Sequence, residues 1–167
     1  MLPGRPHRST LVEPIAGVQL PEYHDRVEFA LGDLELSYYV STVERDEVGP
    51  GIADGYYTRL LARIAHDAPP FHIFPVDLFA RVTKLFGAQD LETDDPAYDA
   101  AFVIRCERPR WLLPRLTEPF RRRHLAHPDT LVRHLDGRFE ALYHRGLDTV
   151  EGIVERAEAL AELHRQL

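Results

Sequence analysis

The alternation of apolar and polar residues along the chain is clearest around residue 30. Residues 27–31 and 34–40 both alternate, and the Gly32-Asp33 pair between them is typical of a two-residue hairpin turn. Such a turn pairs Leu31 with Leu34, which puts the apolar side chains of both strands on one face. The pattern therefore predicts an antiparallel hairpin at the start of the sheet.

A second hairpin is predicted near the other end of the chain. Asp136-Gly137 separates residues 130–135 from residues 138–144, and both flanking stretches alternate. A two-residue turn at this point sets Arg133 opposite Glu140. Two further short strands are expected, at 71–74 and 101–107.

Helical spacing of apolar residues marks three longer segments. Residues 76–86 carry an apolar stripe, and residues 109–126 are helical with a break at Pro114. The closing segment, 148–167, is expected to be an amphipathic helix with Asp148 as its N-cap. The predicted apolar face of this helix consists of Val150, Val154, Ala157, Ala161 and His164.

These elements define an α+β fold. An N-terminal antiparallel β meander is followed by a C-terminal half that mixes helices and strands, and an amphipathic helix closes the chain. Residues 1–22 are rich in proline and aperiodic, so they are expected to form a flexible arm, and residues 23–167 a single domain. Residues 56–65 fit the spacing of both a helix and a strand.

Composition excludes several classes of protein. The 167 residues carry a formal net charge of -7, which disfavours generic binding to nucleic acid or to an anionic membrane. The single cysteine, Cys106, excludes an intrachain disulfide and a multi-cysteine metal site. No apolar run approaches the ~20 residues of a membrane span, and the first ten residues lack the apolar stretch of a secretory signal. A cytoplasmic protein is expected.

Arginine is used almost to the exclusion of lysine. Lys84 is the single lysine among the 20 basic residues, and Arg121, Arg122 and Arg123 form the densest basic cluster. One interpretation is a set of guanidinium groups that bind carboxylate or phosphate. The other is codon bias in a GC-rich genome, with the cluster spread around a solvated helix.

Motifs for nucleophilic or phosphate chemistry are missing from the sequence. None of the three serines lies in G-x-S-x-G or S-x-x-K, and no P-loop or G-x-G-x-x-G motif occurs. Metal binding is the most arguable chemistry, because His124 and His127 have the i, i+3 spacing that brings two imidazoles to one helix face. His134 and Asp129 lie close by in sequence, so a divalent metal could be held by His124, His127 and His134.

The segment from Thr93 to Ile104 resembles the signature T-G-D-P-x-F-D-x-x-F-x-V of a family of uncharacterised bacterial proteins, a domain of unknown function. The order of the surrounding elements is also similar, and it favours a strand over residues 56–65. Asp94 replaces the glycine of the signature and Tyr98 replaces its phenylalanine. If the glycine position has a positive φ, Asp94 is strained there.

The residues of this signature are interpreted as structural. The side chains of Thr93, Asp95 and Asp99 can bond amides of the turn, and Tyr98 and Phe102 can anchor it in the core. Asp95 followed by proline also predicts an N-cap and a short helical turn. The resemblance brings no established activity or catalytic residues to this chain.

The function expected from the sequence is therefore a non-enzymatic binding or scaffold module. Its partner is expected to be a protein, with a second copy of the chain among the candidates, and neither nucleic acid nor a membrane is expected. The alternative is a small metal-dependent enzyme or a metal sensor that uses the histidines within residues 124–134.

Overall fold

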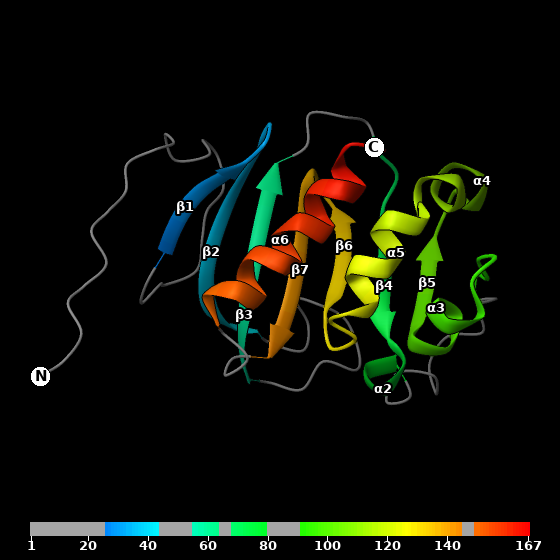
Figure 1. Cartoon of the computed structure of the whole chain (residues 1–167), viewed down its shortest axis with the longest axis horizontal. Coiled ribbons are helices and arrows are strands. Elements are labelled where there is room, and N and C mark those ends of the chain that lie inside the picture. Colours follow the sequence, from blue (N-terminus) through cyan, green and yellow to red (C-terminus); the bar gives the residue numbers. More distant parts are fainter. Residues whose placement is uncertain (1–25, 44–54, 64–67, 80–90, 145–148) are drawn as a thin grey trace, which may run out of the picture.

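The computed structural model describes residues 26–43, 55–63, 68–79, 91–144 and 149–167. The expected N-terminal arm, 1–22, lies outside these ranges. The described residues form a seven-stranded sheet in which every pair of neighbouring strands is antiparallel, in the order β1-β2-β3-β7-β6-β4-β5 (Figure 1). The strands are β1 (Arg26–Leu31), β2 (Leu34–Val43), β3 (Gly55–Arg63), β4 (Phe71–Pro75), β5 (Phe102–Cys106), β6 (Leu131–Leu135) and β7 (Arg138–His144).

Both predicted hairpins are confirmed with their registers. Leu31 lies opposite Leu34 in the β1–β2 pair, and Arg133 lies opposite Glu140 in the β6–β7 pair. The first turn needs a positive φ at Gly32 (65°), and the second needs it at Asp136 (52°) and Gly137 (72°). Glycine and aspartate tolerate this backbone region better than most residues, so turn chemistry and alternation favour the same pairing.

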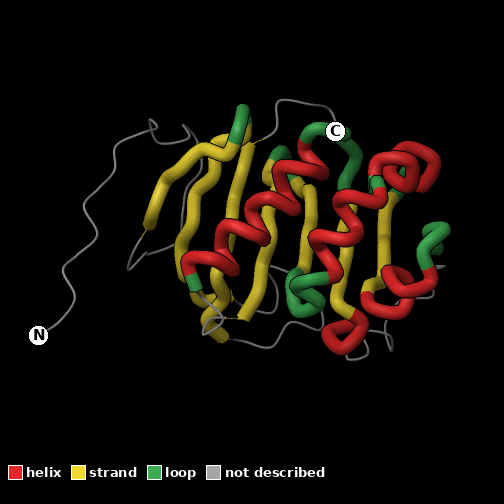
Figure 2. The backbone as a smooth tube through the Cα atoms, viewed as in Figure 1, coloured by secondary structure: helices red, strands yellow, loops and turns green. Residues whose placement is uncertain are grey.

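The β6–β7 hairpin is inserted between β3 and β4, which are consecutive in the sequence (Figure 2). Residues 56–63 of the ambiguous segment belong to the strand β3, as the family layout favoured, and residues 64–65 lie outside the described residues. It pairs with β2 on one side and with β7 on the other, so the central position in the sheet gives it a hydrogen-bonded neighbour at both edges. The fold is α+β, and β1, β2 and β3 are its N-terminal meander.

The helices follow the sequence prediction with local differences. They are α2 (Val76–Phe79), α3 (Pro96–Ala101), α4 (Pro109–Leu112), the 3-10 turn η1 (Leu113–Arg115), α5 (Glu118–Leu125) and α6 (Val150–His164). The predicted break at Pro114 is confirmed, because η1 separates α4 from α5. The predicted helix 76–86 begins at Val76, and its part from residue 80 onward lies outside the described residues.

The N-cap of the closing helix differs from the prediction. Thr149 holds this position, and its Oγ1 accepts a hydrogen bond from the Gly152 amide (3.0 Å). Asp148, the expected cap, lies outside the described residues. A threonine one residue later can cap the same first turn, because only the hydroxyl oxygen is needed to satisfy the amide.

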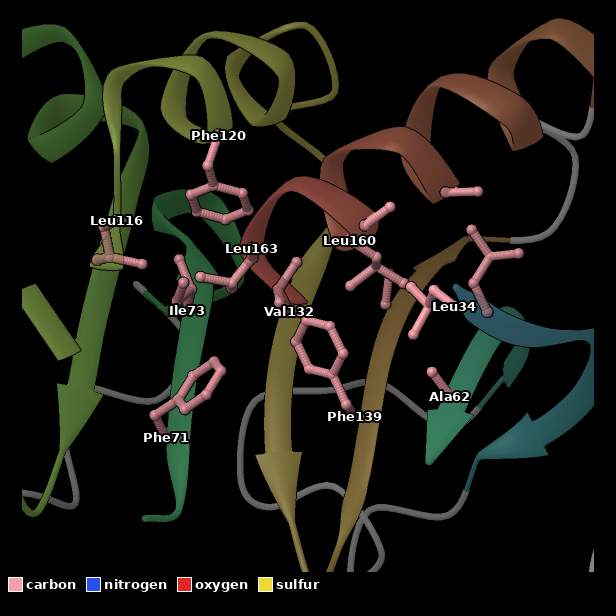
Figure 3. Close-up of a cluster of buried hydrophobic side chains, with 14 of the residues drawn as sticks. Leu34, Ala62, Phe71, Ile73, Leu116, Phe120, Val132, Phe139, Leu160 and Leu163 are labelled. Atoms are coloured by element: carbon pink, nitrogen blue, oxygen red, sulfur yellow. The ribbon is translucent and has the colours of Figure 1, made fainter. Parts of the chain in front are cut away.

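The main core lies between the sheet and the helices α5 and α6, which cross one face of the sheet (Figure 1). Leu160 and Leu163 extend from α6 towards the sheet, where Ile73, Val132 and Phe139 are fully buried (Figure 3). Burying a leucine or phenylalanine side chain stabilises the fold by about 2 kcal/mol. Side chains that alternate with these residues along each strand point to the opposite face of the sheet.

The buried face of α6 is rotated from the predicted one. Ala157 and Ala161 are buried as expected, but Val150 is 80% exposed and Val154 is 41% exposed. The prediction was wrong for these two valines because the helix instead turns Arg156 inward, where it binds groups at the start of β6. From sequence alone, a charged residue of an amphipathic helix is assigned to the face that contacts solvent. This assignment shifts the predicted apolar face of the helix.

Candidate interaction surface

The signature segment folds as a turn that leads into α3. The Asp99 carboxylate accepts hydrogen bonds from the Thr93 amide (3.0 Å) and hydroxyl (2.8 Å). Asp95 caps α3, with Oδ1 accepting from two amides of its first turn (3.1 and 3.2 Å). Tyr98 and Phe102 are buried with their ring centroids 4.9 Å apart. The polar side chains of the signature are thus used within the turn itself.

Asp94 does not have the positive φ that a glycine at this position could indicate. Asp136 is the one non-glycine residue with a positive φ within the described ranges. Asp94 Oδ1 lies 2.9 Å from a guanidinium nitrogen of Arg121, and Asp95 Oδ2 lies 3.4 Å from another. Aspartate therefore stands here without backbone strain and connects the turn to α5.

The basic cluster on α5 is paired with carboxylates. Arg121 contacts the signature turn, Arg122 lies 3.4 Å from Glu118 one turn earlier, and Arg123 lies 2.5 Å from Glu158 of α6. Exposed ion pairs of this kind contribute little to stability, about 0–1 kcal/mol each. Arg122 and Arg123 fit the interpretation of the cluster as a solvated helix face, whereas the Arg121 side chain is 12% exposed and lies against the signature turn.

His124 is buried at the centre of a polar chain in the core. Its Nε2 lies 2.8 Å from the Thr130 carbonyl oxygen and its Nδ1 lies 2.8 Å from the Tyr98 hydroxyl. Because a carbonyl can only accept, Nε2 carries the proton and the Tyr98 hydroxyl donates to Nδ1. The ring also stacks on Phe102 at 3.9 Å. Burial lowers the pKa of His124 to about 4, so the imidazole is neutral near pH 7.

The other histidines predicted to bind metal take no part in the hydrogen bonds of His124. His127 Nε2 lies 3.0 Å from a Glu155 carboxylate oxygen. His134 Nδ1 lies 3.2 Å from a carbonyl oxygen in the segment that leads into β4. Within the described ranges, no three His, Cys, Asp or Glu side chains are grouped as a metal site needs. A metal ion at His124 would have to replace one of its two hydrogen bonds.

Asp129, the carboxylate considered with these histidines, binds Arg156 instead. Both Asp129 carboxylate oxygens lie 3.1 Å from the same guanidinium nitrogen. Arg156 also donates to the Thr130 hydroxyl (2.9 Å) and lies 4.0 Å above the Tyr143 ring. Through Thr130, this buried arginine joins the His124 chain to α6. In the sequence, the only indication of this buried arginine is that a charged residue lies among the apolar residues of the closing helix.

The large hydrophobic side chains that are exposed in the described chain come from two elements. Val27 of β1 is 37% exposed, and Val150 and Val154 are on the first two turns of α6. α6 contacts β1, and Figure 1 shows the start of both elements at the same end of the sheet. Phe29 and Leu31 continue the same face of β1 and are half-buried. We call these five side chains the β1 corner.

The β1 corner borders an edge of the sheet. β1 is the last strand on its side, and no strand of the described chain pairs with its outer edge. On the face opposite to the corner, Arg26 and Glu28 form an ion pair (2.5 Å), and Arg26 also donates to the Ser37 hydroxyl (3.0 Å). An open edge beside exposed apolar side chains is a surface on which another chain can add a strand.

Comparisons with known proteins assign no family to the chain. No protein-family model, no curated protein and no solved structure matches it. The resemblance of residues 93–104 to the uncharacterised bacterial family therefore stays a prediction. Among the helices that the structure describes, none is long and apolar enough to cross a bilayer.

Proposed function

We propose that the protein is a non-enzymatic, cytoplasmic binding module, and that its partner at the β1 corner is a second copy of the same chain. The observation that carries the proposal is that the exposed valines of the described chain come from β1 and α6, two elements in contact, while no other described strand pairs with the outer edge of β1. Exposed apolar side chains occur singly on most proteins, but a group of them at an interaction-competent edge supports a binding surface.

The direction of the backbone amide and carbonyl groups of β1 supports strand addition. Leu31 and Leu34 flank a two-residue turn, so residues 27, 29 and 31 exchange hydrogen bonds with β2. The amide and carbonyl groups of residues 26, 28 and 30 therefore point to the outer edge, where a neighbouring strand can bind them.

The charges on β1 favour a second copy as this neighbour. In an antiparallel pair of β1 strands centred on Val27, Arg26 of each copy faces Glu28 of the other. The same geometry brings the two Val27 side chains together on the side of α6. A strand that carries both charges in this spacing is complementary to itself.

The surface is tested by placing charges on the exposed valines of α6. The V150E/V154E variant is expected to remain folded, because both side chains are exposed and glutamate is favourable in the first turns of a helix. Sedimentation velocity is expected to show a dimer for the wild-type chain and a monomer for this variant. A97E/Q166E is the matched control, since it adds the same charge at exposed positions elsewhere and should remain dimeric.

Pairing through β1 is tested by a charge exchange. R26E alone and E28R alone place like charges opposite each other and are expected to be monomeric. An equimolar mixture of the two variants is expected to form a heterodimer, because each glutamate then faces an arginine. The proposal is contradicted if the wild-type chain is still monomeric at about 100 μM, a concentration at which weak transient contacts form. It is also contradicted if the mixture of R26E and E28R does not associate.

A further inference from the structure

The exposed valines of α6 lie on the half of the helix that has the fewest buried side chains. Within residues 150–156, Gly152 and Arg156 are buried and Ile153 is half-buried, whereas most of residues 157–163 are buried. We call residues 150–156 the N-terminal half of α6. Arg156 is the largest buried side chain of this half, so its contacts decide how firmly the half is held on the sheet.

Arg156 uses every nitrogen of its guanidinium group in these contacts. Nε donates to the Thr130 hydroxyl (2.9 Å), and Nη2 donates to the Asp129 carboxylate (3.1 Å), both just before β6. Nη1 donates to the Gly152 carbonyl of the same helix (3.2 Å), and the group lies 4.0 Å above the Tyr143 ring of β7. Hydrogen bonds from a charged donor are stronger than those between neutral groups. They therefore fix the N-terminal half of α6 to β6 and β7.

The inward position of Arg156 determines where the two valines point. Successive helical residues are about 100° apart around the axis, so Val150 lies about 120° and Val154 about 160° from Arg156. Both valines therefore face away from the sheet when Arg156 is bound, in agreement with their exposed fractions of 80% and 41%. The rotation predicted from sequence, which buries both valines, takes Arg156 away from Asp129 and Thr130.

A surface that is already ordered binds its partner more tightly than one that is ordered only on binding. The apparent affinity falls with the fraction of chains that have the binding conformation. We propose that Arg156 is a positioning residue for self-association, which holds the N-terminal half of α6 so that Val150 and Val154 are in place for a second copy. This inference rests on the proposed function and adds to it a buried residue that lies outside the β1 corner itself.

The R156M variant removes these contacts with little change in side-chain volume. Methionine can still cover the Tyr143 ring but has no donor, and the Asp129 side chain, which is 35% exposed, is hydrated instead. The variant is expected to fold, because an apolar side chain of similar size is often tolerated in place of a buried charge. E155Q is the matched control. Glu155 is in the same half, and its contact with His127 (3.0 Å) involves a carboxylate side chain that is 55% exposed.

Two measurements separate the position of the helix from the dimer. Hydrogen–deuterium exchange is measured below the wild-type dissociation constant, where all chains are monomeric. Amides of residues 153–156 are expected to exchange about tenfold or more faster in R156M, with residues 160–163 unchanged, since a hydrogen bond to a charged group is lost. Sedimentation equilibrium is expected to show a dimer dissociation constant raised about tenfold or more. R156K, which restores the charge without the fork, should recover part of both effects, and E155Q should match the wild type.

The outcomes distinguish this inference from the proposed function. A monomeric wild-type chain contradicts the proposed function and, with it, the role of Arg156. A dimeric wild type contradicts the inference alone if R156M dimerises equally well, if its residues 153–156 exchange at the wild-type rate, or if E155Q has the same effect. If R156M does not fold, D129N gives the test, because it removes the charge that binds Arg156. Faster exchange and a weaker dimer are expected of D129N, and wild-type values overturn the inference.

Discussion

Acidification tests the buried imidazole of His124 most directly. The ring is 1% exposed, and both nitrogens are bound to protein groups in an arrangement that needs the neutral form. Protonation of Nδ1 turns the acceptor of the Tyr98 hydroxyl into a donor and places an uncompensated charge in the core. Unfolding relieves this conflict, so acid is expected to destabilise the protein.

The sign and size follow from the difference in pKa. His124 has a pKa of about 4 in the folded chain and 6.5 when exposed to water. The stabilisation from keeping the ring neutral is fully present above about pH 6.5, and it is lost as the pH falls towards about 4. One pKa unit is worth about 1.4 kcal/mol, so the free energy of unfolding is expected to fall by about 3 kcal/mol over this range.

Urea denaturation followed by circular dichroism, at several values between about pH 7.5 and about pH 4, measures this loss. H124Q removes the titrating group, and it is expected to be less stable than the wild type by about 1–2 kcal/mol at neutral pH because one hydrogen bond is lost. Its stability should then change less with pH. H72Q is measured in parallel, because the pKa of His72 is also lowered to about 4, and H144Q serves as the exposed-histidine control.

The assignment of the acid effect to His124 is refuted if H124Q and the wild type lose the same free energy of unfolding between neutral pH and about pH 4. That result would mean that the ring either is already charged in the folded chain or gains a partner on protonation. A loss that disappears only in H72Q would assign the effect to the opposite face of the sheet.

Two further predictions concern the signature turn and the metal hypothesis. D95A is expected to lower the free energy of unfolding, measured by urea denaturation, by about 1 kcal/mol through loss of the α3 cap. D95N keeps a capping oxygen and should lose less, so equal losses in both variants would contradict this prediction. If His124, His127 and His134 hold a divalent metal ion, native mass spectrometry with added Zn²⁺ gives one ion per chain, and H124Q/H127Q takes up none; uptake unchanged by the double substitution contradicts the hypothesis.

The parts of the fold that could be predicted from the sequence depend on local chemistry. Gly32 and Asp136-Gly137 define turns with a positive φ, and the alternation on each side fixes the register of both hairpins. Pro114 interrupts its helix because proline cannot donate the backbone hydrogen bond. In each case the determining residues lie within a few positions of the element they define.

The parts that could not be predicted depend on contacts between distant segments. Insertion of the β6–β7 hairpin between β3 and β4 is fixed by packing of the whole sheet, and no short pattern encodes it. Arg105, His72 and Arg133 lie side by side on neighbouring strands because β4 pairs with both β5 and β6 in one register. The exposure of Val150 depends in the same way on where α6 lies on the sheet.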